Sequence, residues 1–463
     1  MNIPMEQRPV VAIIYSEGDR FSAESRNMAW WMAAQLGDLG CCIVHLVGVS
    51  PDGIPSNSLN QGKKERIVFK GSWNGKKVEV PAGDINHSHF DMLNTAHVVI
   101  VMVNSSETYM CVEKMKQELG QSSSIGHKCT IFSLQRGVRN NEAVREAFTG
   151  RKDLAIVEGI AGFAVVYDER HKAYVPTEAY PAIVLERLSK EVADIANGPC
   201  NLLENTGLYV NYRKTLTTYA WGMLIWETIH CLSGMTGQTV MQTLLNPRCR
   251  LVLASTFREA SVALETASRG GDWRADLLLI HPFITPRMVE MWLCLPTFFF
   301  RLVGWCLTIL PPHGLYSNVA FDLQNGRKST LSASLGELCA TGKVYGVEMP
   351  VSEQLQRQVL ALEPGEGKAR ADLLRKPVEE MLDVLEREAV IYDGLPPSTE
   401  NGEKDTRKRL KIGQKSLREF RRWLLKAFSV GGVVLLLYLL FVHEHEFEEA
   451  LEFTEGHHDQ EML

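Results

Sequence analysis

The residues near the start of the chain that could do chemistry lie in a turn between an apolar strand and a helix. Residues 10–40 read VVAIIYSEGDRFSAESRNMAWWMAAQLGDLG, the strand–turn–helix order that opens dinucleotide-binding folds. Such turns bind phosphate through backbone amides and need glycines to let the backbone come close. This turn holds one glycine, Gly18. The pattern predicts a phosphate site that has been rebuilt or lost.

Nearby cations could bind phosphate from a new direction. The candidates are Arg20, Arg26 and the run GKKER at 62–66. Guanidinium and ammonium groups suit phosphate oxygens, but charges in such loops are more often simply solvated. Within the turn, Gly18 and Arg26 are the residues that we expect to contact a nucleotide.

Four short apolar runs would form the scaffold that positions this turn. Each is rich in β-branched residues and nearly continuous, as expected for strands buried on both faces of a parallel sheet. Helical segments lie between several of the runs, so a doubly wound α/β domain is predicted. The runs cover residues 10–16, 41–49, 97–105 and 129–135.

The rest of the chain departs from this alternation in two places. Residues 65–80 alternate apolar and polar side chains around Asn74–Gly75, which predicts an antiparallel hairpin. After about residue 200, segments with helical periodicity dominate. We therefore expect a Rossmann-like domain over residues 8–200, a helical domain over 205–390 and a polar, basic linker over 395–422.

The composition indicates a soluble body with free thiols. The chain has 463 residues, of which 45% are hydrophobic and 22% charged, and its net charge of -6 gives no reason to expect nucleic acid as a partner. Its ten cysteines are scattered, without a C-x-x-C pair, which indicates buried thiols in a reducing compartment rather than disulfides or a zinc site. The N-terminus lacks the pattern of a secretory signal. We expect the body to lie in the cytosol.

The C-terminal region has the pattern of a membrane anchor. Residues 423–442, WLLKAFSVGGVVLLLYLLFV, are long enough to cross a bilayer. Ten Lys and Arg lie within residues 404–426, whereas residues 443–463 carry eight acidic residues and no Lys or Arg. The positive-inside rule then places the body in the cytosol and the acidic tail across the membrane. A buried or interfacial helix is the alternative to this single transmembrane helix.

Other segments near the anchor invite less specific interpretations. Residues 291–310 are apolar but contain Pro296 and Arg301, which favours a buried or membrane-apposed helix over a second span. The basic run at 407–411 could bind nucleic acid, but its place before an apolar segment favours anionic lipid headgroups. Histidines in the acidic tail could bind a metal weakly, although a solvated tail is the stronger expectation, so we predict no metal site.

The block at residues 317–363 carries a resemblance to a known family. It resembles the C-terminal domain of the ketopantoate reductases (2-dehydropantoate 2-reductases). Weaker matches at 99–108, 132–138 and 211–222 extend the resemblance over about residues 8–365. It implies an N-terminal Rossmann domain, a helical domain of the 6-phosphogluconate dehydrogenase C-terminal type, and an active site between them. The residues of the block in step with the family motif are Asp322, Gly326, Arg327, Gly336, Gly346, Pro350 and Leu355.

The resemblance implies NADP(H)-dependent reduction of a 2-oxo acid, with a lysine as the general acid. Lys214 stands at the lysine position, with a solvated lysine in the polar NYRK run as the alternative. The substrate-binding positions depart from the family: they hold Thr218, Asn318 and Thr330 in place of Asn, Ser and Glu. A threonine can still hydrogen-bond a substrate but offers no charge.

The remaining positions implied by the resemblance also depart. Arg136 replaces the asparagine of the family's strand–turn, where it could bind an anionic group, and Asn104 replaces the lysine after the fourth strand. The three glycines of the nucleotide turn fall on Glu24, Arg26 and Ala29. Glu24 would place an anion where the fold usually attracts phosphate.

Two functions follow from these features. The first is a membrane-anchored, NADP-dependent oxidoreductase acting on a 2-oxo acid or related carbonyl compound, with Lys214 as the general acid. The second is a catalytically degenerate relative that binds a ligand or serves as a scaffold at the membrane. A structural adaptor acting only through its helices is a weaker third hypothesis. The sequence leaves a homodimer open.

Overall fold

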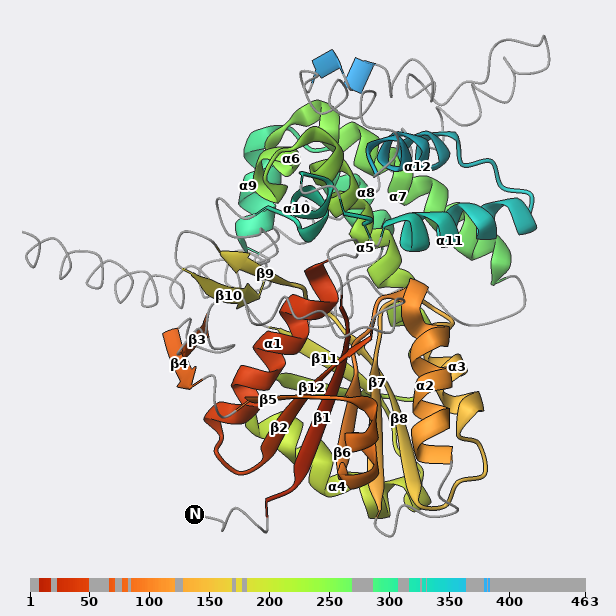
Figure 1. Ribbon diagram of the computed structural model, residues 1–463. Coiled ribbons are helices and arrows are strands. Elements are labelled where there is room, and N and C mark those ends of the chain that lie inside the picture. Colours follow the sequence, from red (N-terminus) through yellow and green to blue (C-terminus); the bar gives the residue numbers. More distant parts are fainter. Residues whose placement is uncertain are drawn as a thin grey trace, which may run out of the picture. The chain divides into compact units, whose positions relative to one another are not determined.

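The computed structural model describes most of the chain up to residue 383 (Figure 1). The chain divides into two compact units, residues 1–290 with 311–389 and residues 291–310 with 390–463. The described residues are 8–17, 23–49, 66–70, 77–81, 85–120, 128–168, 172–176, 181–268, 286–306, 316–324, 327–329, 331–363, 379–380 and 382–383.

An eight-stranded sheet forms the α/β part of the first unit. Its strand order is β12-β11-β8-β7-β6-β1-β2-β5, and neighbouring strands from β8 to β5 run parallel. Only β11 pairs antiparallel, with β8, among these described strands. The strands are β1 (Val10–Ser16), β2 (Ile43–Val49), β5 (Ile85–Ser88), β6 (Val98–Val101), β7 (Cys129–Leu134), β8 (Leu154–Ala161), β11 (Ala182–Glu186) and β12 (Tyr209–Arg213).

Helices cover both faces of this sheet, as predicted for a doubly wound fold (Figure 1). Successive residues of β1 enter different cores because side chains alternate along a strand. Ile13 packs with α1 (Ala23–Asp38) and α4 (Lys190–Asn205). Ile14 packs with α2 (Thr108–Gly120), α3 (Asn140–Ala147) and the 3₁₀ helix Phe90–Thr95. Burial on both faces explains the continuous apolar runs.

A second, four-stranded sheet contains the predicted hairpin. Its order is β4-β3-β10-β9, formed by β3 (Arg66–Lys70), β4 (Lys77–Pro81), β9 (Val165–Asp168) and β10 (Ala173–Pro176). β3 and β4 pair antiparallel, with Val68 opposite Glu79, which confirms the hairpin. The Asn74–Gly75 turn itself lies outside the described residues.

The helical part begins after β12. Its central helix α5 is buried along most of its length. At Gly234 of α5, an added Cβ would lie 2.4 Å from Cγ1 of Val319 on α10, so the two helices pack at close range. The carboxylate of Glu259 accepts hydrogen bonds from the Val351 and Ser352 amides and caps α12. The helices are α5 (Thr217–Thr236), α6 (Val240–Leu245), α7 (Pro247–Ala267), α8 (Pro286–Leu293), α10 (Asn318–Gln324), α11 (Leu331–Val344) and α12 (Pro350–Leu362). Helix α9 (Thr297–Cys306) belongs to the second unit, together with the last residues of α8.

Of the two apolar segments of the sequence, the structure describes most of residues 291–310 but none of residues 423–442. Residues 291–310 do not form one continuous helix, because α8 ends at Leu293 and α9 begins at Thr297, directly after Pro296. Among the residues that the structure describes, no helix combines the length and apolarity needed to cross a membrane. The predicted transmembrane segment, 423–442, and the acidic tail lie outside these residues.

Candidate functional site

A cavity of 220 Å³ lies at the carboxyl ends of β6 and β7. The first turns of α1 border it on the sheet side, and side chains of α5 and α11 border it on the helical side. Ligands of doubly wound folds bind at this edge of the sheet. The polar side chains that line the cavity include Glu24, Asn104, Arg136, Glu227, Ser334 and Glu337.

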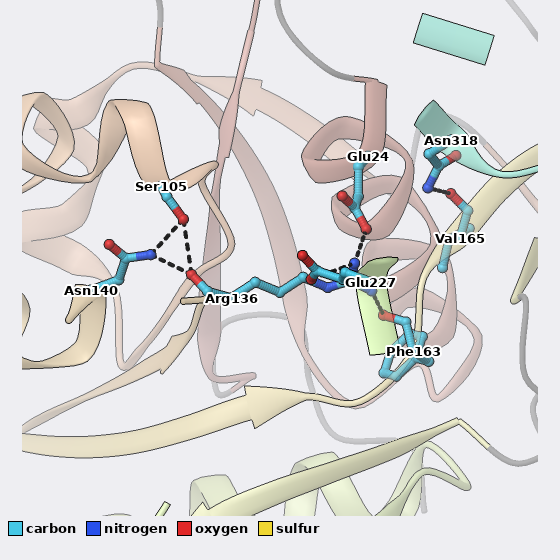
Figure 2. A network of polar contacts seen from close by, with 8 residues as sticks. All are labelled: Glu24, Ser105, Arg136, Asn140, Phe163, Val165, Glu227 and Asn318. Atoms are coloured by element: carbon cyan, nitrogen blue, oxygen red, sulfur yellow. Dashed lines mark hydrogen bonds and ion pairs between the residues drawn. The ribbon is translucent and has the colours of Figure 1, made fainter. Parts of the chain in front are cut away.

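Arg136 connects the two parts of the first unit through ion pairs (Figure 2). Its Nη1 lies 2.5 Å from Oε1 of Glu24 on α1 and 3.3 Å from Oε1 of Glu227 on α5. Its Nη2 donates to the carbonyl oxygen of Phe163 at 2.8 Å. The carboxylates are 7% and 6% exposed, so these contacts are shielded from water. Removing one partner of such a buried pair is costly, because it leaves the other charge buried and unpaired.

The turn after β7 fixes the backbone of Arg136. The Arg136 carbonyl oxygen accepts hydrogen bonds from the Ser105 hydroxyl, at 3.0 Å, and from the Asn140 amide (Figure 2). Gly137 follows with φ 102, a conformation that favours glycine. A side chain at Gly137 would also approach the Asn140 amide nitrogen to 2.7 Å. The guanidinium is therefore aimed by a turn that tolerates little variation.

Glu227 has the most altered acidity among the groups that face the cavity. Burial raises the pKa of its carboxyl to about 7, although Arg136 opposes this shift. One turn further along α5, burial and the same arginine lower the pKa of His230 to about 4. At neutral pH the histidine is uncharged, and Glu227 is divided between its protonated and ionised forms.

Short hydrogen bonds join the first turn of α1 to the ends of β1 and β6. The Ser25 hydroxyl donates to the Met102 carbonyl oxygen at 2.6 Å and accepts from the Ser16 amide at 2.8 Å. The Ser16 hydroxyl donates to Oε2 of Glu107 at 2.7 Å and accepts from the Asn104 amide at 2.9 Å. All these groups are buried. At this edge of the sheet, the hydroxyl groups of Ser16 and Ser25 are thus hydrogen-bonded within the chain itself.

Two of the site residues predicted from the sequence line the cavity. Arg136 lines it while ion-paired with Glu24, and Asn104 lies just after the end of β6. Arg26 is half-buried in α1, near enough to Tyr15 for its charge to lower the pKa of that phenol, against the larger effect of burial. It is not among the lining residues of the cavity. Gly18 lies outside the described residues.

Three of the other predicted residues, Lys214, Thr218 and Asn318, are not among the lining residues of this cavity. Lys214 is exposed in the short turn between β12 and α5, and Thr218 is half-buried in the first turn of α5. Asn318 is buried, and its Nδ2 donates to the Val165 carbonyl oxygen at 3.1 Å (Figure 2). Thr330 lies outside the described residues. The structure does not bring Lys214 together with Arg136, and the role of Lys214 stays a prediction.

The main residue missed from the sequence is Glu227. It is the only Asp, Glu, Lys or Arg in the twenty residues of α5, TTYAWGMLIWETIHCLSGMT. A single charge within an apolar helix is a signal for a paired or functional group. Its partner could not be identified, because Arg136 lies about ninety residues away.

Comparison with known families agrees with this architecture. Residues 215–363 match the model described as the C-terminal domain of ketopantoate reductase PanE/ApbA. These residues form a domain of the ketopantoate reductase C-terminal type. The sequence has no match among curated proteins.

Solved structures share the fold across most of the chain. A PanE/ApbA family ketopantoate reductase from Ralstonia eutropha JMP134 is 16% identical, with a TM-score of 0.51, covering 76% of this chain and 98% of that one. D-Mandelate dehydrogenase in a ternary structure with NADH and anilino(oxo)acetate is 14% identical, with a TM-score of 0.54, covering 79% and 99%. The 2-dehydropantoate 2-reductase from Geobacter metallireducens GS-15 is 16% identical, with a TM-score of 0.51, covering 76% and 99%.

The resemblance to ketopantoate reductases implies a nicotinamide dinucleotide, whose pyrophosphate lies over the first turn of α1 in folds of this kind. Here that turn presents the buried carboxylate of Glu24, ion-paired with Arg136. A phosphate beside Glu24 would be repelled, and the Ser25 hydroxyl is already hydrogen-bonded on both sides. The described residues of the turn therefore do not fit a pyrophosphate; residues 18–22 are not among them.

Proposed function

We propose that this chain is a catalytically degenerate ketopantoate-reductase-type protein that binds a small molecule while tethered to a membrane. The observation that carries the proposal is the Glu24–Arg136 ion pair, which puts an internal anion at the phosphate position of the fold. The exposed position of Lys214, apart from the cavity, supports it further. The resemblance to reductases then concerns the fold, while the chemistry has been replaced.

The cavity limits the ligand by size and charge. At 220 Å³ it is smaller than the ~300–1,000 Å³ typical of pockets for drug-sized molecules. The charges of Glu24 and Arg136 oppose each other. Burial raises the pKa of Glu337, an effect that the charge of Arg139 partly offsets. Met28, Leu134 and Leu224 add apolar surface. These features suit a small, neutral or singly charged organic molecule with one polar end.

The membrane tether rests on the sequence of the C-terminal region. The apolar segment 423–442, with ten basic residues before and around its start and only acidic charges after it, supports a single span with the body on the cytosolic side. A ligand-binding body held in this way would act at a bilayer surface.

A thermal-shift screen of the full chain against small 2-oxo and 2-hydroxy acids, with NADPH present, tests the proposal. A ligand should raise the melting temperature without consumption of NADPH, because binding to the native state stabilises it. The Arg136→Met variant should lose this response. Sustained oxidation of NADPH with any of these acids would contradict the proposal.

A second function, NADP(H)-dependent reduction of a 2-oxo acid, is favoured by one observation. The carboxyl of Glu227 faces the cavity with a pKa raised by burial to about 7, a value suited to proton donation at neutral pH. If the chain turns over, Glu227→Gln should then abolish activity while Lys214→Ala leaves it unchanged. The reverse result would restore the lysine predicted from the sequence.

A further inference from the structure

Helix α9 presents an exposed aromatic surface. Phe298 is 71% exposed and Phe299 53% exposed, and their rings contact each other edge to face at a centroid distance of 5.4 Å. Leu302 extends the apolar surface with an exposed fraction of 37%. Contiguous exposed apolar residues of this kind mark binding surfaces rather than ordinary solvent-facing positions.

The opposite face of α9 is held by its neighbour α8. The rings of Phe300 and Trp292 stack at 4.4 Å, and the Trp292 indole donates to the Phe300 carbonyl oxygen at 2.9 Å. At about 100° per residue, Phe298 and Leu302 share one face, Phe299 and Arg301 flank it, and Phe300 points the other way. Packing of Phe300 therefore fixes the aromatic face outward.

We infer that α9 lies in the interface of an anionic phospholipid bilayer, with Phe298 and Phe299 among the upper acyl chains. The exposed Arg301 beside them would meet lipid phosphates, as basic residues do in interfacial helices. Aromatic rings are favoured at this depth of a bilayer. The chemistry of this face thus suits a lipid surface.

The C-terminal region of the chain is the reason for assigning a lipid bilayer to the exposed face of α9. This inference therefore rests on the proposed tether. Residues 384–422, which connect the described body to the apolar segment, span at most ~140 Å when fully extended. The body thus stays near the bilayer, where even a weak contact is effectively intramolecular. The basic residues before the apolar segment favour the same anionic lipids.

The test uses the full chain in vesicles of phosphatidylcholine and phosphatidylserine, with and without nitroxide-labelled lipid. In a Cys294→Ser background, which removes an exposed thiol, Phe298→Cys carries an environment-sensitive fluorophore. Tyr109→Cys, at a 78% exposed position of α2, is the matched control. The Cys294→Ser chain without an added cysteine is labelled in parallel, and its fluorescence measures the labelling of the remaining native thiols. The probe at 298 should shift to shorter wavelength and lose most of its emission to the lipid quencher, whereas the probe at 109 should not.

The outcomes separate this inference from the tether. If the chain floats with the vesicles but both probes respond alike, the contact of α9 is refuted while the tether stands. If the chain does not float, both are refuted. A probe at 298 that is already shielded from aqueous iodide without vesicles would show a protein partner instead of lipid. Adding Phe299→Glu should abolish the quenching at 298 while flotation remains.

Discussion

Arg136 is the single residue on which the site depends most. It neutralises carboxylates from α1 and α5, two elements far apart in the sequence. Each carboxylate is buried, so neither can be solvated if the guanidinium is removed. The sequence indicated Arg136 as an anion-binding residue, but the anions turn out to belong to the chain itself.

Arg136→Met should destabilise the protein by about 3–5 kcal/mol, because it leaves two buried carboxylates without their partner. Urea unfolding at pH 7.5 measures the loss. The matched control is Arg258→Met, which removes a pair with Glu290 in which the arginine side chain is 61% exposed. That change should cost less than about 1 kcal/mol. Equal losses in the two variants would show that Arg136 contributes no more than a surface charge.

The acidity of Glu227 predicts a pH dependence of stability. Its pKa is raised from the ordinary 4.5 to about 7 in the folded state, so the folded protein binds the proton more tightly than the unfolded chain. The stabilising contribution is complete below pH 4.5 and is lost as the pH rises through 7. Between pH 5 and pH 8 the free energy of unfolding should fall by up to about 3 kcal/mol relative to Glu227→Gln. Parallel pH profiles for the two proteins would contradict the raised pKa.

At the scale of elements, the local sequence pattern predicted the strands and the hairpin, which depend on interactions between residues close in sequence. The buried parallel strands appeared as continuous β-branched runs, and Asn74–Gly75 indicated the β3–β4 hairpin. The partner of that hairpin could not be predicted, because β3 meets β10 across about a hundred residues. The same limit hid the contact between Arg136 and Glu227. Pairings of distant segments depend on packing that no local pattern encodes.

Two glycines of the helical part provide a matched test of helix packing. Gly234→Ala should destabilise the protein by about 1–3 kcal/mol, because the new Cβ meets Val319 at 2.4 Å and the Ala320 backbone nitrogen at 3.3 Å. In Gly336→Ala the Cβ meets the amide end of Gln356, which can move aside. This second change should be neutral or stabilising by up to about 1 kcal/mol, since alanine favours helix. Thermal unfolding of both variants measures these changes. A larger loss of stability in Gly336→Ala than in Gly234→Ala would contradict the close packing of α5 on α10.

At the scale of the whole molecule, the proposed function joins a fold that has lost its catalysis to a membrane anchor. The full chain should sediment with membranes and resist extraction by alkaline carbonate, because the 423–442 segment would span the bilayer. A tag placed after residue 463 should be protected from protease until the membrane is permeabilised. Release by carbonate would instead indicate a peripheral or interfacial helix.

The most direct test of the central claim is a titration of the full chain with NADPH and NADH, followed by nucleotide fluorescence and by thermal shift. The account predicts no saturable binding up to about millimolar concentrations. Any binding free energy would then be weaker than the ~4 kcal/mol that corresponds to a millimolar Kd. The reason is the Glu24 carboxylate at the phosphate position, held there by Arg136. Micromolar binding with a preference for NADPH would contradict the account and establish that the turn before α1 is a rebuilt, working nucleotide site.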